Sequence, residues 1–302
     1  MIVAEHLSKT FGAKRAVTDV SFTVAPGKVT GFLGPNGAGK STTMRMIVGL
    51  DRPSAGRVTV DGRDYRRLSS PLTEVGVLLD AKAVHTGRTA RDHLRAMAAT
   101  HGIPRTRVDE VIEITGLGSV AKKRAGGFSL GMGQRLGIAA ALLGDPHTLI
   151  LDEPVNGLDP EGVMWVRRFV RHAASEGKTV LLSSHLMSEM SMTADHLIVL
   201  GRGRVLADAP LPEIVEQWTS MKVTVRSPKA SELAERVARD DVSVTRSSDD
   251  LLEVTGLTAA TIGDLAAEHR IPLHELTPST GTLEDAYLRL TGDEVEYKTK
   301  DI

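Results

Sequence analysis

The chain has 302 residues, of which 41% are hydrophobic and 25% are charged, as in an ordinary globular protein with a core of good size. Its net charge of −1 gives no overall attraction to nucleic acid or an acidic membrane, and the lack of cysteine excludes disulfides and thiolate metal sites. The first residues lack the basic and apolar regions of a secretory signal peptide, so no signal peptide is expected. The best apolar run, residues 138–143, is far too short to span a bilayer, so any membrane role requires a partner.

The first elements predicted are two antiparallel strands at residues 2–7 and 16–24, where apolar positions nearly alternate and Gly12 marks a turn. Phe11 lies on that turn. It is either a modest core aromatic or a platform on which an adenine ring stacks, and the spacing alone does not separate these two interpretations.

A phosphate-binding pattern follows the strand predicted at residues 29–33. It has the form G-x-x-x-x-G-K-S/T and consists of Gly34, Pro35, Asn36, Gly37, Ala38, Gly39, Lys40, Ser41 and Thr42, called the phosphate loop below. Glycines let the backbone curl so that its N–H groups surround phosphate oxygens, and a helix predicted at residues 41–48 points its positive end there. Lys40 would reach the β- and γ-phosphates, and the Ser41 hydroxyl would bind Mg²⁺. We therefore expect a nucleoside-triphosphate site.

The middle of the chain alternates strands and helices. Strands are predicted at residues 56–60 and 74–79, and helices at residues 89–100 and 105–115. Asp80 follows the second strand, where it either caps the strand end or adds a negative charge near Mg²⁺. A glycine-rich stretch at residues 126–135 opens a helix, and Ser129 at its start indicates either a second phosphate site or a plain serine cap.

An apolar strand is predicted at residues 148–153, and it ends in two carboxylates, Asp152 and Glu153. Desolvating two neighbouring carboxylates costs free energy, so a buried strand rarely ends in such a pair without a reason. Their position downstream of a phosphate loop therefore indicates a function. We interpret Asp152 as the acid on the Mg²⁺ side and Glu153 as the base that polarises the attacking water. His185 follows the next strand, at residues 179–183, on the edge of an open α/β sheet where ligands bind.

The pattern changes after a hairpin at residues 197–207 and a short helix near Trp218. The order β-α-β-β-α-β with a terminal helix is typical of a small α+β ferredoxin-like sandwich, with elements predicted at residues 222–226, 229–239, 242–246, 251–255, 258–269, 271–276 and 282–290. Residues 219–302 also carry 16 acidic and 10 basic side chains, a net charge of −6, against +5 for the remainder. We expect two domains, 1–218 and 219–302, with a frayed polar tail from Gly292 to Ile302.

Taken together, residues 1–218 resemble the ATP-binding subunit of an ABC transporter, because six motifs fall in that family's order. Phe11 matches the adenine-stacking aromatic, and Gly34–Thr42 match the Walker A loop. Asp152 matches the Walker B acid, and Glu153 matches the catalytic glutamate. Asn156–Asp159 match the D-loop, and His185 matches the switch histidine. Ser129 and Gly131 keep the phosphate-contacting places of the family signature, where Phe128, Leu130 and Met132 replace Leu, Gly and Gln. Asp80 stands where the family has a glutamine.

The resemblance implies an α/β fold with a mixed sheet, an antiparallel β subdomain and a helical subdomain. It implies an ATPase that uses ATP and Mg²⁺, with Lys40, Glu153 and His185 in catalysis, Ser41, Asp152 and Asp80 at the metal, and Asp159 at the nucleotide. It further implies a second copy bound head to tail across ATP and a separate membrane permease that would hold the chain on the cytoplasmic face of the cell membrane. Within the family the chain looks like the drug- and antibiotic-resistance exporter type, of the daunorubicin-resistance kind.

Two other classes of protein remain as alternatives. One is a soluble ABC ATPase that acts on DNA or ribosomes. The DNA-repair kind inserts a long coiled coil, whereas only residues 43–127, without heptads, separate the two phosphate motifs here, and the ribosomal kind carries two cassettes per chain. The other class is a regulatory nucleotide-binding protein without turnover, against which Glu153 and His185 argue. We expect no nucleic-acid partner.

Overall fold

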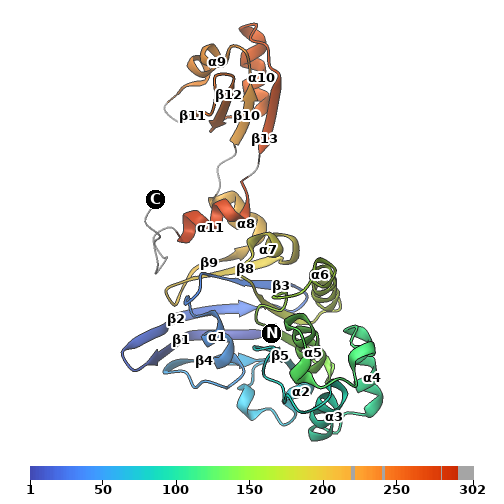
Figure 1. The fold of residues 1–302 in the computed structure, drawn as a ribbon. Coiled ribbons are helices and arrows are strands. Elements are labelled where there is room, and N and C mark those ends of the chain that lie inside the picture. The colour runs from blue at the N-terminus through green and yellow to red at the C-terminus, as the bar shows by residue number, and fades with distance from the viewer. Residues whose placement is uncertain (219–221, 240–241, 280, 292–302) are drawn as a thin grey trace. The chain divides into compact units, whose positions relative to one another are not determined.

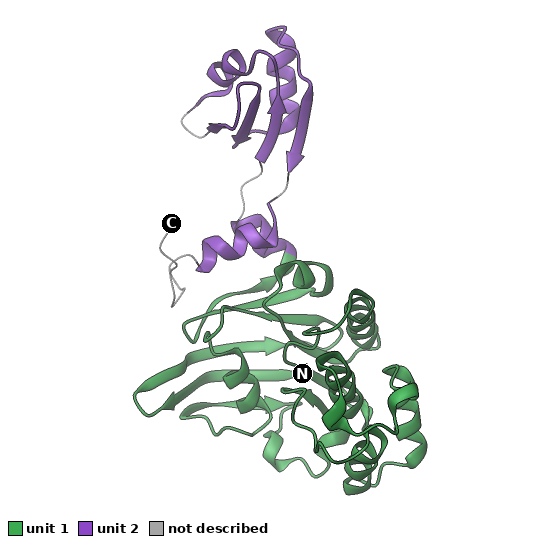
Figure 2. Cartoon of the chain, in the orientation of Figure 1, with its two compact units in different colours: residues 1–211, 293–302 green, residues 212–292 purple. Residues whose placement is uncertain are grey.

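The computed structural model describes residues 1–218, 222–239, 242–279 and 281–291 (Figure 1). These residues form two compact units, the first comprising residues 1–211 and the second beginning at Pro212 (Figure 2). The domain boundary expected after Trp218 falls at residues 219–221, and the tail expected to fray is residues 292–302. Both segments lie outside the described residues.

A six-stranded mixed sheet in the order β5-β6-β7-β3-β8-β9 is the centre of the first unit. The first five strands of this order are parallel, and β9 pairs antiparallel with β8. The strands are β3 (Val29–Leu33), β5 (Val75–Leu78), β6 (Thr148–Leu151), β7 (Thr179–Ser183), β8 (His196–Gly201) and β9 (Arg204–Pro210). Because the parallel strands run the same way, the segments that follow β3, β5, β6 and β7 emerge at one edge.

Helices α6 and α7 cover one face of this sheet, with α6 against β7 and β3 and α7 against β3. Helix α5 packs on β5, and it also contacts α3 and α4, which pack on each other. These three helices form the helical part of the unit. The helices of the unit are α1 (Lys40–Ile47), α2 (Pro71–Glu74), α3 (Ala90–Thr100), α4 (Arg105–Ile114), α5 (Leu130–Leu142), α6 (Pro160–Ser175) and α7 (Met187–Thr193).

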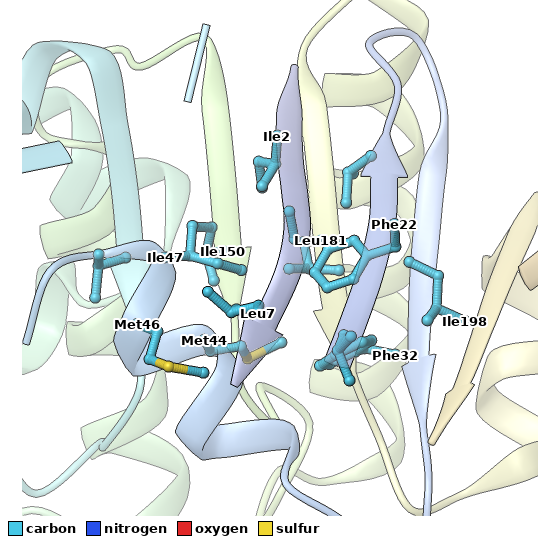
Figure 3. Close-up of a cluster of buried hydrophobic side chains, with 14 of the residues drawn as sticks. Ile2, Leu7, Phe22, Phe32, Met44, Met46, Ile47, Ile150, Leu181 and Ile198 are labelled. Carbon is cyan, nitrogen blue, oxygen red and sulfur yellow. The ribbon is translucent and has the colours of Figure 1, made fainter. Parts of the chain in front are cut away.

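A separate antiparallel sheet in the order β2-β1-β4 covers the other face. Its strands are β1 (Ile2–Phe11), β2 (Lys14–Val24) and β4 (Ala55–Val60). Successive residues of a strand point to opposite faces, so Phe32 enters the core between the two sheets while Gly31 faces α7. The rings of Phe22 and Phe32 lie 5.5 Å apart in that core, beside Met44 of α1 (Figure 3). This packing fixes α1 and the loop before it.

The second unit has its own four-stranded antiparallel sheet, in the order β11-β12-β10-β13. Its described elements are α8 (Leu211–Trp218), β10 (Lys222–Arg226), α9 (Ala230–Val237), β11 (Ser243–Arg246), β12 (Leu251–Thr255), α10 (Ala259–Glu268), β13 (Glu275–Ser279) and α11 (Leu283–Thr291). Side chains of α9 and α10 share a buried apolar cluster with β10 and β12. Each unit therefore has a core of its own.

One strand of this unit was misplaced by the sequence pattern. A strand was expected at residues 271–276, but β13 begins only at Glu275, which pairs with Arg226. Ile271 is buried in the apolar cluster and donates its backbone N–H to Ala266 at the end of α10. Pro272 has no N–H to give to a sheet. The apolar residues at 271 and 273 therefore cover the core of the unit before the strand starts.

In the part of the chain that the structure describes, no helix combines the length with the apolar character needed to cross a bilayer. This agrees with the short apolar runs of the sequence.

Candidate active site

A cavity of about 550 Å³ lies where β5 and β6 end and α1 begins. Its volume is in the range of sites that hold a small molecule. Many of the predicted site residues line it, namely Phe11, Pro35, Asn36, Gly37, Ala38, Gly39, Lys40, Ser41, Thr42, Asp80, Asp152 and Glu153. Phe11 and Glu153, which are 142 residues apart in the sequence, are thus brought to one place.

The phosphate loop has the conformation that its glycines predict. Gly39, at the start of α1, has a φ of 101°, and a Cβ there would lie 2.7 Å from the carbonyl oxygen of Ala16. Lys40 is buried, and its ammonium donates to the carbonyl oxygens of Gly34 at 2.6 Å and Pro35 at 3.3 Å. Burial lowers the pKa of Lys40, although the nearby carboxylates of Glu153 and Asp152 act in the opposite direction. The loop therefore holds a buried cation beside an open helix N-terminus.

Ser41 and Asp152 meet at the edge of the cavity. The Ser41 hydroxyl donates to Asp152 Oδ2 at 2.7 Å, and the Ser183 hydroxyl donates to Asp152 Oδ1. Mg²⁺ in nucleotide sites is held by one or two carboxylates together with phosphates and waters. One carboxylate and one hydroxyl fit that requirement, whereas the described residues contain no cluster of three or more acidic or histidine side chains for a metal held by protein alone.

Glu153 is held at its backbone and at its carboxylate. Its N–H donates to Ser183 Oγ at 2.9 Å, and its carbonyl oxygen accepts from Gln134 Nε2 at 3.0 Å. Its Oε2 lies 2.7 Å from Nδ1 of His185. His185 does not line the cavity, but this contact places its imidazole beside the carboxylate of a residue that does. A carboxylate beside the phosphate loop with an imidazole partner has the arrangement of a general base and its orienting group.

Phe11 is 50% exposed, with Lys9 Nζ 4.8 Å from the centre of its ring. Because half of its surface is open and the residue lines the cavity, the alternative of a core aromatic is wrong. An exposed ring at the mouth of the cavity suits an adenine-stacking platform.

Asp80 makes the hydrogen bond expected of a residue that caps the end of the strand. Its Oδ1 accepts the backbone N–H of Lys82 at 2.8 Å just beyond β5. The carboxylate also lines the cavity, so a role at the metal stays a prediction.

Four predicted ligands, Gly34, Ser129, Gly131 and Asp159, do not line the cavity of their own chain. Ser129 is exposed and caps α5 by accepting the N–H of Met132 at 3.3 Å. Asp159 caps α6 by accepting the N–H of Gly162 at 2.9 Å. Gly131 lies so close to the D-loop that a Cβ would be 2.7 Å from the carbonyl oxygen of Gly157. Their contacts with a nucleotide stay predictions.

Two residues with clear roles here, Ser183 and Gln134, were missed by the sequence analysis. A hydroxyl at the C-terminal end of a predicted strand, two residues before His185, is a signal that pointed to Ser183. The signal for Gln134 is a polar side chain that occupies a buried position of α5.

Comparison with known proteins agrees with this geometry. The family profile described as ABC transporter matches residues 17–156, and one described as a domain of unknown function matches residues 221–284. The bacitracin transport ATP-binding protein BcrA of Bacillus licheniformis is 33% identical over 300 residues, which are 97% of each chain. The Nod factor export ATP-binding protein I of Rhizobium sp. (strain N33) is 35% identical over 302 residues, 96% of each chain.

A solved structure entitled "Structure of ATP binding subunit of ABC transporter" has a TM-score of 0.66 and 28% identity, and it covers 72% of this chain and 92% of its own. The phosphate loop, the paired carboxylates and these similarities lead to one conclusion: the chain belongs to the family of ABC transporter ATP-binding proteins and is an ATPase of that fold.

Proposed function

We propose that Glu153 is the general base of ATP hydrolysis in this cavity. The observation that carries the proposal is the 2.7 Å contact between Glu153 Oε2 and His185, next to the 2.7 Å contact between Ser41 and Asp152. Glu153 would accept the proton of the attacking water, and His185 would keep the carboxylate aimed at the γ-phosphate. Lys40 would exchange its two carbonyl partners for phosphate oxygens, which favour its charged form more strongly.

Mg²⁺ bound with the nucleotide would neutralise charge on the phosphates. Ser41 Oγ and Asp152 Oδ2 are the atoms that would hold it. Ser183 donates to the other oxygen of Asp152, so the carboxylate keeps its orientation when Ser41 turns to the metal.

Two copies of the chain would complete each site. Ser129 is exposed at the positive end of α5, outside the cavity of its own chain, which leaves it available to the γ-phosphate bound by another copy. A head-to-tail pair would therefore place Ser129 and Gly131 of one copy against the nucleotide held by Lys40 of the other.

ATP hydrolysis would drive transport through a separate membrane permease. The relatives named for bacitracin transport and Nod factor export cover nearly the whole chain, including the second unit. We infer an exporter of drugs, antibiotics or other hydrophobic compounds, with this chain held on the inner face of the cell membrane by the permease.

The test is the steady-state ATPase rate of Glu153→Gln, which keeps the size of the side chain and removes the base. Turnover should fall at least about a hundredfold, the scale of a lost general base, while ATP binding persists. Glu161→Gln, at an exposed acid in the first turn of α6, is the matched control and should match the wild type. Wild-type turnover by Glu153→Gln, with contaminating ATPases excluded, would refute the assignment.

A further inference from the structure

Gln134 is a buried polar side chain on α5 whose amide is only half used. It is 5% exposed, its Nε2 donates to the carbonyl oxygen of Glu153 at 3.0 Å, and its Oε1 is buried with no hydrogen-bond partner among the described residues. A carbonyl oxygen only accepts hydrogen bonds, so the nitrogen of the amide must face Glu153. The orientation of the side chain is thereby fixed.

The backbone that receives this hydrogen bond is strained. Glu153 has a φ of 50°, the left-handed region that residues with a Cβ rarely adopt. Such a conformation persists only where surrounding groups hold it, and it gathers at functional sites. Ser183 holds the N–H of Glu153, while Gln134 and the N–H of Asn156, at 3.2 Å, hold its carbonyl oxygen.

A packing role alone does not explain a glutamine at this place. Burying an unpaired Oε1 costs free energy, and an apolar side chain of similar size would avoid that cost. The amide therefore contributes through its NH₂ group, whose one hydrogen-bond partner among the described residues is the carbonyl oxygen of Glu153.

We propose that Gln134 is a positioning residue for Glu153. By fixing the carbonyl oxygen it stabilises the left-handed conformation, which directs the Glu153 carboxylate to His185 and to the cavity. The inference rests on the proposed role of Glu153 as the base. It also joins that base to the helix that Ser129 begins, because Gln134 lies five residues further along the same stretch of chain.

The test compares Gln134→Leu and Gln134→Glu with the wild type. Gln134→Leu removes the donor and should lower kcat about tenfold or more, since a displacement of about 1 Å in a catalytic group can cost about a hundredfold. The KM for ATP should stay within about twofold, because the phosphate loop is untouched. Ile138→Val, one turn further along α5 in the buried core, is the matched control for a slightly loosened helix and should keep its kcat.

Gln134→Glu gives a pH-dependent change in kcat that a change in packing alone would not produce. At pH 8 the new carboxylate cannot donate, so its kcat should be as low as that of Gln134→Leu. Burial next to Glu153 raises the pKa of the new carboxyl, so lowering the pH from 8 to 6 favours its neutral form, whose O–H can donate to the carbonyl oxygen. The ratio of its kcat to that of the wild type should therefore rise at least about fivefold from pH 8 to pH 6, whereas the ratio for Gln134→Leu stays flat.

Two results would overturn the proposal. One is wild-type kcat for folded Gln134→Leu, and the other is a pH-independent ratio for Gln134→Glu. The second decides the matter even where Gln134→Leu fails to fold. Glu153→Gln in the same assay separates this inference from the proposed function. If Glu153→Gln loses turnover while the Gln134 variants behave like the wild type, only the role of Gln134 is refuted.

Discussion

Asp80 lines the cavity and combines a local backbone contact with a carboxylate that faces the nucleotide site. Its Oδ1 is used by the N–H of Lys82, and no partner of Oδ2 is found among the described residues. An ionised Asp only accepts hydrogen bonds, whereas the glutamine of the resembled family both donates and accepts and is longer by one methylene. One carboxylate oxygen of Asp80 therefore remains for a metal or a metal-bound water.

We predict that Asp80→Asn weakens the Mg²⁺ dependence of ATPase activity, because it keeps the cap acceptor but removes the charge and replaces the second carboxylate oxygen by an NH₂ group that cannot bind a metal. Asp80→Gln should keep substantial turnover by restoring the family's group. The measurement is a Mg²⁺ titration of the ATPase rate at fixed ATP for the wild type and both variants. Superimposable curves would make Asp80 a structural cap alone, and the metal role would be abandoned.

At the scale of elements, the sequence predicts what depends on local pattern. The buried strand β6 is predicted from its apolar run and the two acids that follow, although the prediction extended it to Glu153 and the strand ends at Leu151. The side-chain contacts that shape the site could not, because Gln134 and Ser183 reach Glu153 across 19 and 30 residues of sequence. The same is true of β13, where the apolar residues before Glu275 serve the core of the unit instead of the sheet.

The contact between β5 and α5 gives a prediction about stability. A Cβ on Gly76 would lie 2.1 Å from the carbonyl oxygen of Ala141, so Gly76→Ala has to push the strand and the helix apart. Overpacking of this kind costs about 1–3 kcal/mol, which should lower the melting temperature by several degrees. Gly127→Ala is the matched control, since its nearest neighbour is the flexible end of Lys123 at 3.4 Å. Equal melting temperatures for the two variants in calorimetry would contradict the packing described.

At the scale of the whole molecule, the chain consists of two units with different tasks. The first unit holds every residue assigned to the nucleotide, and its core lies between two sheets. The second has a separate core, and the 219–302 segment that forms most of it carries a net charge of −6 and no phosphate motif. We propose that residues 219–302 act in assembly or regulation.

A chain that ends at Trp218 should therefore stay folded and bind ATP with unchanged affinity. Calorimetric titration of ATP into the shortened chain checks this, with circular dichroism to confirm folding. A loss of affinity in a folded shortened chain would show that the second part contributes to the nucleotide site.

We propose that a complete hydrolytic site needs Ser129 of a second copy. The most direct test is the mass of Glu153→Gln in solution with MgATP, measured by light scattering after size exclusion. The account predicts about twice the 32.3 kDa of one chain with MgATP, and one chain when Ser129→Arg is added to block the approach to phosphate. A Glu153→Gln protein that stays at one chain with ATP bound, or a dimer that Ser129→Arg leaves intact, would contradict it.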